Sequence, residues 1–265
     1  MTISLPNKAN LNDDQLKEVY RKMVLIRLFE EKVDFFFAKG MIHGTTHLCV
    51  GEEATAAGSG AVLKTKDWIT ATHRGHGQTI AKGTPVHKMM AELFGKKTGY
   101  CKGKGGSMHI ADFGVGMLGA NGVVAAGIPI ATGAAQALKL QGRDSIVACF
   151  FGDGAINRGP FLEGLNWARV HELPVLFVCE DNRYSATTAT GTMTAGDGAA
   201  VRALSLDIPA VTVDGNDAEA SRRGQKYRKE PVTAISVEGN SAALGLARRR
   251  TRSSRSRRAR GGASY

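Results

Sequence analysis

Two short apolar runs mark the centre of the chain, IVACFF at residues 146–151 and VLFVC at residues 175–179. Their β-branched and aromatic residues predict two buried strands. Between the runs, Pro160 suits the first turn of a helix, where its missing N–H would have no partner. Helical spacing places four apolar residues on one face of that helix: Phe161, Leu162, Leu165 and Ala168. A strand, a crossover helix and a second strand form a βαβ unit with parallel strands.

A long amphipathic helix is predicted ahead of this unit. Asn12 and Gln15 have the spacing of a capping box, and Gly40 is placed to end the helix. Its apolar face contains Leu16, Val19, Met23, Ile26, Phe29 and Val33. The FFF run at residues 35–37 makes the last turn apolar nearly all round, so we expect it to be buried, in the core or against a partner subunit.

The remaining pattern predicts a doubly wound, mostly parallel α/β sheet flanked by helices. Residues 68–72 and 211–213 are expected to be strands, and residues 199–206 a short helix. An alanine-rich helix at residues 129–140 is expected to cover the sheet together with the first helix. Residues 185–198 are polar and lack periodicity, which predicts a mobile surface loop.

Candidate ligands follow the two strands of the βαβ unit. Gly152-Asp153-Gly154 ends the first strand, and Glu180-Asp181-Asn182 ends the second. Parallel strands end at one edge of a sheet, where open α/β sheets bind ligands. The glycines let a bulky anion approach, and Asp153 and Asn182 offer the hard oxygen atoms that Mg²⁺ uses to hold a diphosphate. The alternative is that both residues only cap turns.

Charge divides the chain into two parts. Residues 218–265 contain 13 of the 35 Lys and Arg residues but only 3 of the 24 Asp and Glu residues. Residues 1–217 therefore contain 22 basic and 21 acidic residues, a net charge of +1. The four cysteines lack CxxC spacing and are expected to be reduced. No apolar run approaches the ~20 residues of a membrane span. Residues 1–15 lack the features of a secretory signal or transit peptide, so we expect a cytoplasmic protein.

The GDG sequence at residues 152–154 is separated from Asn182 by residues 155–181. This pattern resembles the GDG…N motif of thiamine diphosphate enzymes. The surrounding residues, from about 16 to 217, are similar to the α subunit of the decarboxylating component of a 2-oxo acid (pyruvate) or acetoin dehydrogenase complex. The resemblance implies a thiamine diphosphate-binding fold. It also implies that Asp153, Asn182 and the backbone carbonyl of Tyr184 hold Mg²⁺, with Gly154 and Ala155 against the diphosphate.

Further segments carry the same resemblance. His47, in HLCVGEEA, matches the histidine that faces the thiazolium ring; a metal site here would lack a carboxylate at a helical offset. His73 and Arg74, in HRGHG, match residues that contact the diphosphate; the alternative is a solvated basic loop. Gly122 and Val124 lie in a loop similar to the one that holds the aminopyrimidine ring.

Two glycine-rich segments suggest other nucleotide sites but lack the required context. Residues 99–109 do not have P-loop spacing; the family has the same KGKGGSMH loop near the active-site mouth, which makes Ser107 and His109 candidates for contact with cofactor or substrate. Residues 114–119 match GxGxxG, but no predicted strand precedes them and no helix opens on the third glycine, so we reject NAD binding.

The resemblance implies an oxidoreductase subunit that decarboxylates a small 2-oxo acid and passes the acyl group to lipoyl-lysine on a transacylase. Glu52 and Glu53 are not convincing as the carboxylate that activates the aminopyrimidine, which the family takes from its β subunit, so an α₂β₂ heterotetramer is implied. The alternatives are an acetoin dehydrogenase α subunit and an inactive relative that binds cofactor or partner without turnover.

The predicted domains are a thiamine diphosphate-binding domain at residues 1–217 and an atypical basic tail at residues 218–265. The family's RxxGHS-like run is absent from this tail, and residues 248–260 contain eight arginines and no acid. We expect this block to be disordered, and we hypothesise that the whole segment after about Asp217 is an out-of-frame translation. A nucleic-acid-binding tail is the rival, disfavoured because no aromatic residue is interleaved with the arginines.

Overall fold

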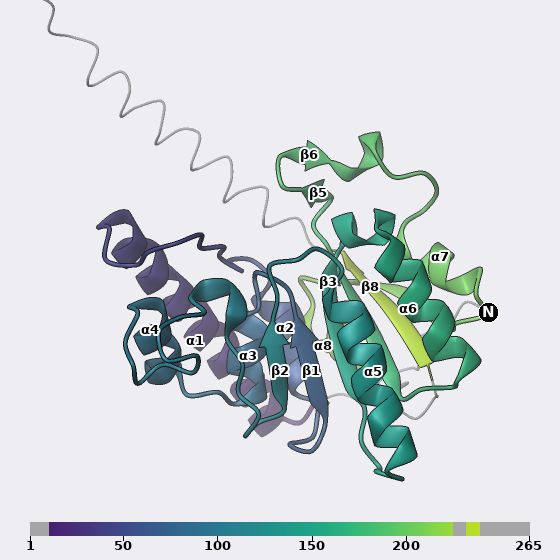
Figure 1. The fold of residues 1–265 in the computed structure, drawn as a ribbon, viewed down its shortest axis with the longest axis horizontal. Coiled ribbons are helices and arrows are strands. Elements are labelled where there is room, and N and C mark those ends of the chain that lie inside the picture. The colour runs from purple at the N-terminus through teal and green to yellow at the C-terminus, as the bar shows by residue number, and fades with distance from the viewer. Residues whose placement is uncertain (1–10, 225–231, 239–265) are drawn as a thin grey trace, which may run out of the picture.

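The computed structural model describes residues 11–224 and 232–238, which fold around a parallel sheet (Figure 1). The strand order is β2-β1-β3-β4-β8-β7, and every neighbouring pair is parallel. The strands are β1 (Trp68–Ala71), β2 (Met117–Ala120), β3 (Val147–Gly152), β4 (Val175–Asp181), β7 (Ala210–Asp214) and β8 (Val232–Glu238). The predicted parallel α/β sheet is therefore confirmed.

The predicted βαβ unit is β3, α6 (Gly159–Val170) and β4. Pairing runs from Val147 opposite Val175 to Gly152 opposite Glu180, so the two strands end side by side. Pro160 lies in the first turn of α6, as predicted. Leu162 does not share the buried face of α6, because its side chain is 48% exposed.

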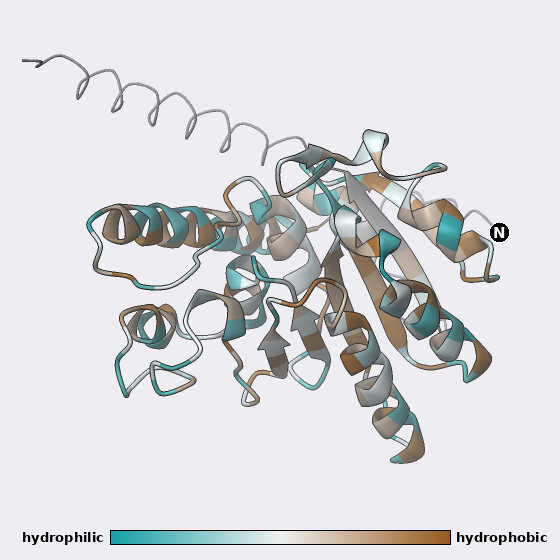
Figure 2. Ribbon diagram, turned by 45° about the horizontal axis from the view of Figure 1, so that its top comes forward, coloured by the Kyte–Doolittle hydropathy of each residue, from teal (hydrophilic) through white to brown (hydrophobic). Residues whose placement is uncertain are grey.

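Helices cover both faces of the sheet because successive strand residues point to opposite sides. One face packs against α5 (Gly127–Leu140), α6 and α7 (Ala199–Leu204), and the other against α8 (Ala218–Gly224). Beside the sheet, α1 (Asp13–Ala38), α2 (Glu53–Gly60), α3 (His76–Lys82) and α4 (Val86–Leu93) share another apolar core (Figure 1). The strands are largely hydrophobic, whereas the helices mix hydrophobic and hydrophilic residues (Figure 2). None of the helices described here is long and apolar enough to cross a membrane.

The first helix has the predicted start but not the predicted environment. The Asn12 side chain accepts the Gln15 N–H at 2.9 Å, and the Asn12 N–H donates to the Gln15 side chain at 3.1 Å, which confirms the capping box. α1 packs on α2 and α3 rather than covering the sheet. Phe35 and Phe37 are 48% and 39% exposed, so the prediction of a buried last turn is wrong within this chain.

The segment after β4 contains more regular structure than predicted. Strands β5 (Tyr184–Ser185) and β6 (Thr188–Ala189) pair in antiparallel fashion, and the 3₁₀ turn η3 (Thr190–Thr192) follows. Two other 3₁₀ turns, η1 (Ser107–His109) and η2 (Asp153–Asn157), were not predicted. All four cysteines are free, as expected.

The described fold continues past the boundary predicted at residue 217. α8 begins at Ala218, and β8 inserts between β4 and β7, pairing with β4 from Val232 to Glu238. The arginine-rich block at residues 248–260 lies outside the described residues, so its disorder stays a prediction. The out-of-frame hypothesis for the segment after about Asp217 also stays a prediction, although α8 and β8 of that segment belong to the fold.

Packing of α8 can be tested at Gly58 on α2. A Cβ atom at Gly58 would overlap the carbonyl oxygen of Ala218 and lie 3.1 Å from its carbon. We expect Gly58→Ala to lower the free energy of unfolding by about 1–3 kcal/mol, because the backbone of α8 must move. In the matched control, Gly133→Ala on α5, a Cβ meets nothing within 4 Å. This control should gain roughly 0.5–1 kcal/mol in urea denaturation. Equal effects at both positions would contradict the packing.

Candidate functional site

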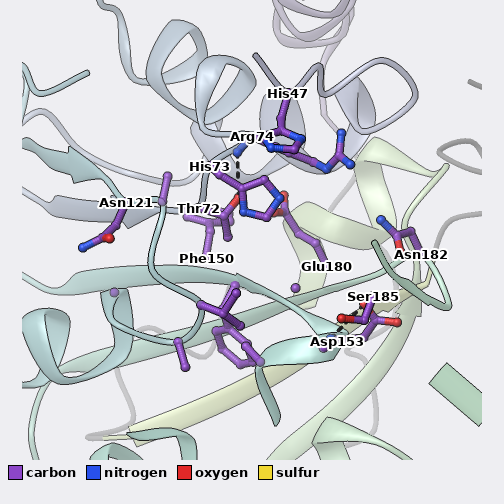
Figure 3. A pocket seen from close by; sticks show the side chains of 18 of the residues that line it. His47, Thr72, His73, Arg74, Asn121, Phe150, Asp153, Glu180, Asn182 and Ser185 are labelled. Carbon is purple, nitrogen blue, oxygen red and sulfur yellow. Dashed lines mark hydrogen bonds between the residues drawn. The ribbon is translucent and has the colours of Figure 1, made fainter. Parts of the chain in front are cut away.

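A cavity of about 200 Å³ lies at the carboxyl ends of β1, β3 and β4 (Figure 3). Its wall comes from the segments that follow these strands, from the loop between β2 and α5, from the β5 hairpin, and from the segment ahead of α2 that carries His47 and Glu52. Parallel strands carry these segments to one edge of the sheet, where such folds bind ligands. The cavity is therefore where the sequence predicts a cofactor.

The structure brings most of the predicted site residues together. Nine of the ten line the cavity: His47, His73, Arg74, Val124, Asp153, Gly154, Ala155, Asn182 and Tyr184. The tenth, Gly122, is not part of the lining, and a Cβ there would lie 3.5 Å from the Met108 methyl group. Ser107 and His109 also lie outside it. Proximity places these residues but does not assign their roles, which stay predictions.

Asp153 directly follows β3 and is 5% exposed. Its Oδ1 accepts the Gly154 N–H at 3.0 Å, while its buried Oδ2 makes no hydrogen bond with any described residue. Burial and the neighbouring Asp181 carboxyl raise the pKa of Asp153 to about 7. A buried carboxylate oxygen without a partner, beside a second carboxyl, is the kind of environment that a cation stabilises.

Asn182 stands at the end of the neighbouring strand. Its Oδ1 accepts the Tyr184 N–H at 3.0 Å, which fixes the turn that carries the Tyr184 carbonyl. Figure 3 shows Asp153 and Asn182 on the same side of the cavity. The sheet register explains this arrangement, because Gly152 lies opposite Glu180 and both strands end at one edge.

Basic side chains line another part of the cavity. The rings of His47 and His73 meet edge to face, with centroids 4.6 Å apart. Arg74 Nη1 donates to the Leu48 carbonyl at 2.5 Å, which ties the segment after β1 to the segment that carries His47. Burial, with the nearby Arg74 charge and His47, lowers the pKa of His73 to about 4.

We therefore expect His73 to be neutral throughout the physiological pH range. Histidine NMR titration should show one ring, identified by its loss in His73→Asn, with a pKa near 4 in the folded chain. In urea the same ring should titrate near its ordinary value of about 6.5. The stability that this shift contributes is present above the unfolded pKa and is lost as the pH falls towards 4. A folded-state pKa near the ordinary value would contradict the burial of His73.

Two glutamates that line the cavity have raised pKa values, which the sequence did not predict. Burial raises the pKa of Glu52 to about 7, against the opposing effects of Arg74 and Asn182. Burial and the nearby Glu52 hold the pKa of Glu180 well above its ordinary range, although Gln78 Nε2 donates a hydrogen bond to it. No local pattern reveals this interaction, because residues 52 and 180 come near each other only in the folded chain.

Buried polar groups also hold the KGKGGSMH loop in place. His76 Nδ1 lies 2.6 Å from Glu30 Oε1, and His76 Nε2 lies 3.0 Å from Ser107 Oγ. All three side chains are buried. Glu92 accepts four backbone N–H bonds, three from this loop and one from Cys101 directly before it. Ser107 therefore anchors the loop to α1 and α3 in this chain.

Comparison with known proteins gives consistent matches. Residues 21–243 match the family described as dehydrogenase E1 component. The chain is 52% identical over 208 residues to the α subunit of acetoin:2,6-dichlorophenolindophenol oxidoreductase from Bacillus subtilis (strain 168). This match covers 78% of the chain and 62% of that subunit. It is 39% identical over 224 residues to the pyruvate dehydrogenase E1 component subunit alpha of Porphyra purpurea, covering 82% and 65%.

A solved structure supports the fold alone. The transketolase from Campylobacter jejuni superimposes with a TM-score of 0.62 at 16% sequence identity, covering 86% of this chain and 38% of the transketolase. The chain spans 62–65% of the length of the two curated relatives named above.

Proposed function

The chain belongs to the dehydrogenase E1 component family, and from this premise we propose that it is the thiamine diphosphate-binding α subunit of an acetoin-type dehydrogenase. Identity favours this substrate, at 52% to the acetoin relative against 39% to the pyruvate relative. A pyruvate dehydrogenase α subunit is the second candidate, and the match over most of its α-subunit sequence supports it.

One observation carries the proposal: Asp153 and Asn182 follow neighbouring strands at one edge of the sheet, and Oδ2 of the buried Asp153 makes no hydrogen bond with the described residues. These residues fit a Mg²⁺ ion that completes its shell with phosphate oxygens and water. Asp153, Asn182 and the Tyr184 carbonyl would hold the ion. Gly154 has no side chain to hinder an approaching diphosphate. A Cβ there would also lie 2.5 Å from Ser185 Oγ, so its packing against β5 requires glycine.

The other cavity residues suit the remaining tasks of binding and orientation. When bound, thiamine diphosphate would supply a carbanion to attack a carbonyl carbon and a cationic ring to accept the electron pair of the carbon–carbon bond that breaks. The Arg74 guanidinium and His73 would receive diphosphate oxygens, and Gly122 and Val124 would position the ring at the other end. His47 would face the reacting carbon, and the neutral His73 adds no second positive charge beside Arg74.

A complete site requires other chains in this proposal. Neither cavity glutamate is assigned to activate the aminopyrimidine, so we place that carboxylate on a β subunit in an α₂β₂ assembly. A lipoyl-bearing transacylase would then accept the acyl group. If the missing RxxGHS-like run is essential, the chain binds cofactor without turnover, which keeps the inactive relative as an alternative.

Co-expression with the β subunit of an acetoin-type relative tests the function. We expect acetoin-dependent reduction of a dye, dependent on thiamine diphosphate and Mg²⁺, to exceed pyruvate-dependent reduction. The reverse preference would select the second candidate. If calorimetry detects cofactor binding but neither activity is found, the inactive relative is selected. Absence of Mg²⁺-dependent binding would refute the proposal.

A further inference from the structure

Glu30, on α1, is a buried carboxylate that connects several segments near the cavity, although α1 itself does not line it. Its Oε1 lies 2.6 Å from His76 Nδ1, and its Oε2 accepts the Cys49 N–H at 3.2 Å. His76 Nε2 lies in turn 3.0 Å from Ser107 Oγ. One carboxylate therefore connects α1 to α3, to the segment ahead of α2 and to the 3₁₀ turn η1. We call Glu30, His76 and Ser107 the buried network.

The hydrogen bonds of the buried network are satisfied in either charge state of the imidazole. An ionised carboxylate only accepts, so His76 Nδ1 carries a proton and donates it to Glu30. The Ser107 hydroxyl can donate to Nε2 or accept from it. Water does not compete for these bonds, because the three side chains are 0%, 1% and 4% exposed. The Phe29 ring meets the His76 ring edge to face, with centroids 5.6 Å apart, and restricts its rotation.

Each connection of Glu30 reaches a segment that carries a candidate cofactor residue two positions away. Arg74 Nη1 also donates to the Leu48 carbonyl, which joins two of these segments directly. The third segment packs on the loop between β2 and α5, since a Cβ on Gly122 would lie 3.5 Å from the Met108 methyl group. The three pairs are Cys49 and His47, His76 and Arg74, and Ser107 and His109.

We propose that Glu30 is a positioning residue for the cofactor site, whose carboxylate holds the three segments in one arrangement. The inference rests on the proposed function, because these segments carry residues proposed to receive thiamine diphosphate. A carboxylate suits this role because each of its oxygen atoms accepts from a different segment. An amide has one acceptor oxygen, and its NH₂ group would face an N–H donor. A displacement of about 1 Å in a binding or reacting group changes rates by roughly 100-fold.

The buried network has the order of an acyl-transfer triad: carboxylate, imidazole and hydroxyl. Such a triad needs a substrate carbonyl within about 3–3.5 Å of the hydroxyl oxygen. Ser107 is 4% exposed and lies outside the cavity, so a substrate has no access to its Oγ in this arrangement. The geometry therefore favours positioning over nucleophilic attack, and a serine-directed probe separates the two roles.

Calorimetric titration of Glu30→Gln with thiamine diphosphate and Mg²⁺ tests the positioning role. We expect the dissociation constant to rise by about 10–100-fold, the range found when a residue that orients a ligand is lost. Ser107→Ala removes one connection and should raise it by about threefold to tenfold. The double variant should lie within about threefold of Glu30→Gln, because both changes act through the His76 ring. Glu31→Gln, on the exposed side of the same helix, is the matched control and should bind like the parent chain.

Proton NMR of the cofactor-free chain gives a readout that does not depend on binding or turnover. The buried Nδ1 proton of His76, 2.6 Å from a carboxylate oxygen, should give a slowly exchanging resonance downfield of the amide region. Its loss in His76→Gln identifies it. In Glu30→Gln this resonance should move or disappear, and the ring resonances of His47 and His109 should shift with it. Glu31→Gln should leave all three rings unchanged.

The outcomes separate this inference from the proposed function. If the parent chain does not bind the cofactor, the proposed function fails, and the His47 and His109 shifts still decide whether Glu30 holds the segments. If the parent chain binds it and folded Glu30→Gln binds equally well, the inference fails. If Glu30→Gln does not fold, Ser107→Ala decides by the same two measurements. Labelling of Ser107 by a fluorophosphonate probe would make its hydroxyl a nucleophile and overturn the positioning role.

Discussion

Asp153→Asn should raise the dissociation constant for thiamine diphosphate in the presence of Mg²⁺ by at least about 100-fold. Loss of a residue that only orients a metal ligand lowers metal affinity by about 10–100-fold, and Asp153 is placed as a direct ligand. The substitution keeps the shape of a side chain that is 5% exposed but removes its negative charge. Its Oδ2 atom has no hydrogen-bond donor among the described residues, so the lost charge is the one available to a cation. Calorimetric titration with thiamine diphosphate, with and without Mg²⁺, measures the effect.

The same substitution at Asp197 is the matched control. Asp197 is exposed, follows the β5–β6 hairpin and does not line the cavity, so Asp197→Asn should bind the cofactor like the parent chain. The expected signature is specific: Asp153→Asn should lose the Mg²⁺-dependent part of binding. Unchanged Mg²⁺-dependent binding by Asp153→Asn would remove Asp153 from the metal site and leave the turn-capping interpretation of this residue.

The sequence predicted those parts of the fold that are fixed by local pattern. β3 and β4 are continuous apolar runs, which buried parallel strands require, and Pro160 marks the start of α6. β2 was missed because its four residues lie inside a glycine-rich segment. β8 was missed because it lies in the compositionally biased tail, and its place between β4 and β7 depends on pairing with two distant strands.

The residues of the site also fall into those that the sequence could place and those that it could not. Residues that directly follow a strand, such as Asp153 and Asn182, could be placed because parallel strands share an edge. Interactions between distant segments could not be placed: Glu52 helps to raise the pKa of Glu180, and His76 lies within hydrogen-bond distance of both Glu30 and Ser107. The exposure of Phe35 was missed because an apolar turn predicts burial but does not show whether this chain or another covers it.

Glu92 shows how one buried charge organises a glycine-rich loop. Oε2 accepts the N–H groups of Cys101 and Gly103, both at 2.8 Å, and Oε1 accepts those of Gly105 and Gly106 at 2.8 and 3.1 Å. Glu92 is 1% exposed. Burial raises the pKa of this carboxyl, but the four N–H bonds outweigh burial, so the pKa is lowered overall. The carboxylate therefore stabilises the fold above its unfolded-state pKa, and this contribution is lost as the pH falls through the lower folded-state value.

Glu92→Gln should lower the free energy of unfolding at pH 7 by about 2–4 kcal/mol, because the amide NH₂ group cannot accept the two N–H bonds that one carboxylate oxygen accepts. Urea denaturation measures the loss, and the difference from the parent chain should shrink in acid. Amide hydrogen exchange at residues 101–106 should accelerate, since the loop loses its acceptor. The same change at the exposed Glu172 should alter stability by less than about 0.5 kcal/mol. An equally small effect at Glu92 would mean that the Ser107–His76 contact holds the loop and that the Glu92 carboxylate is dispensable.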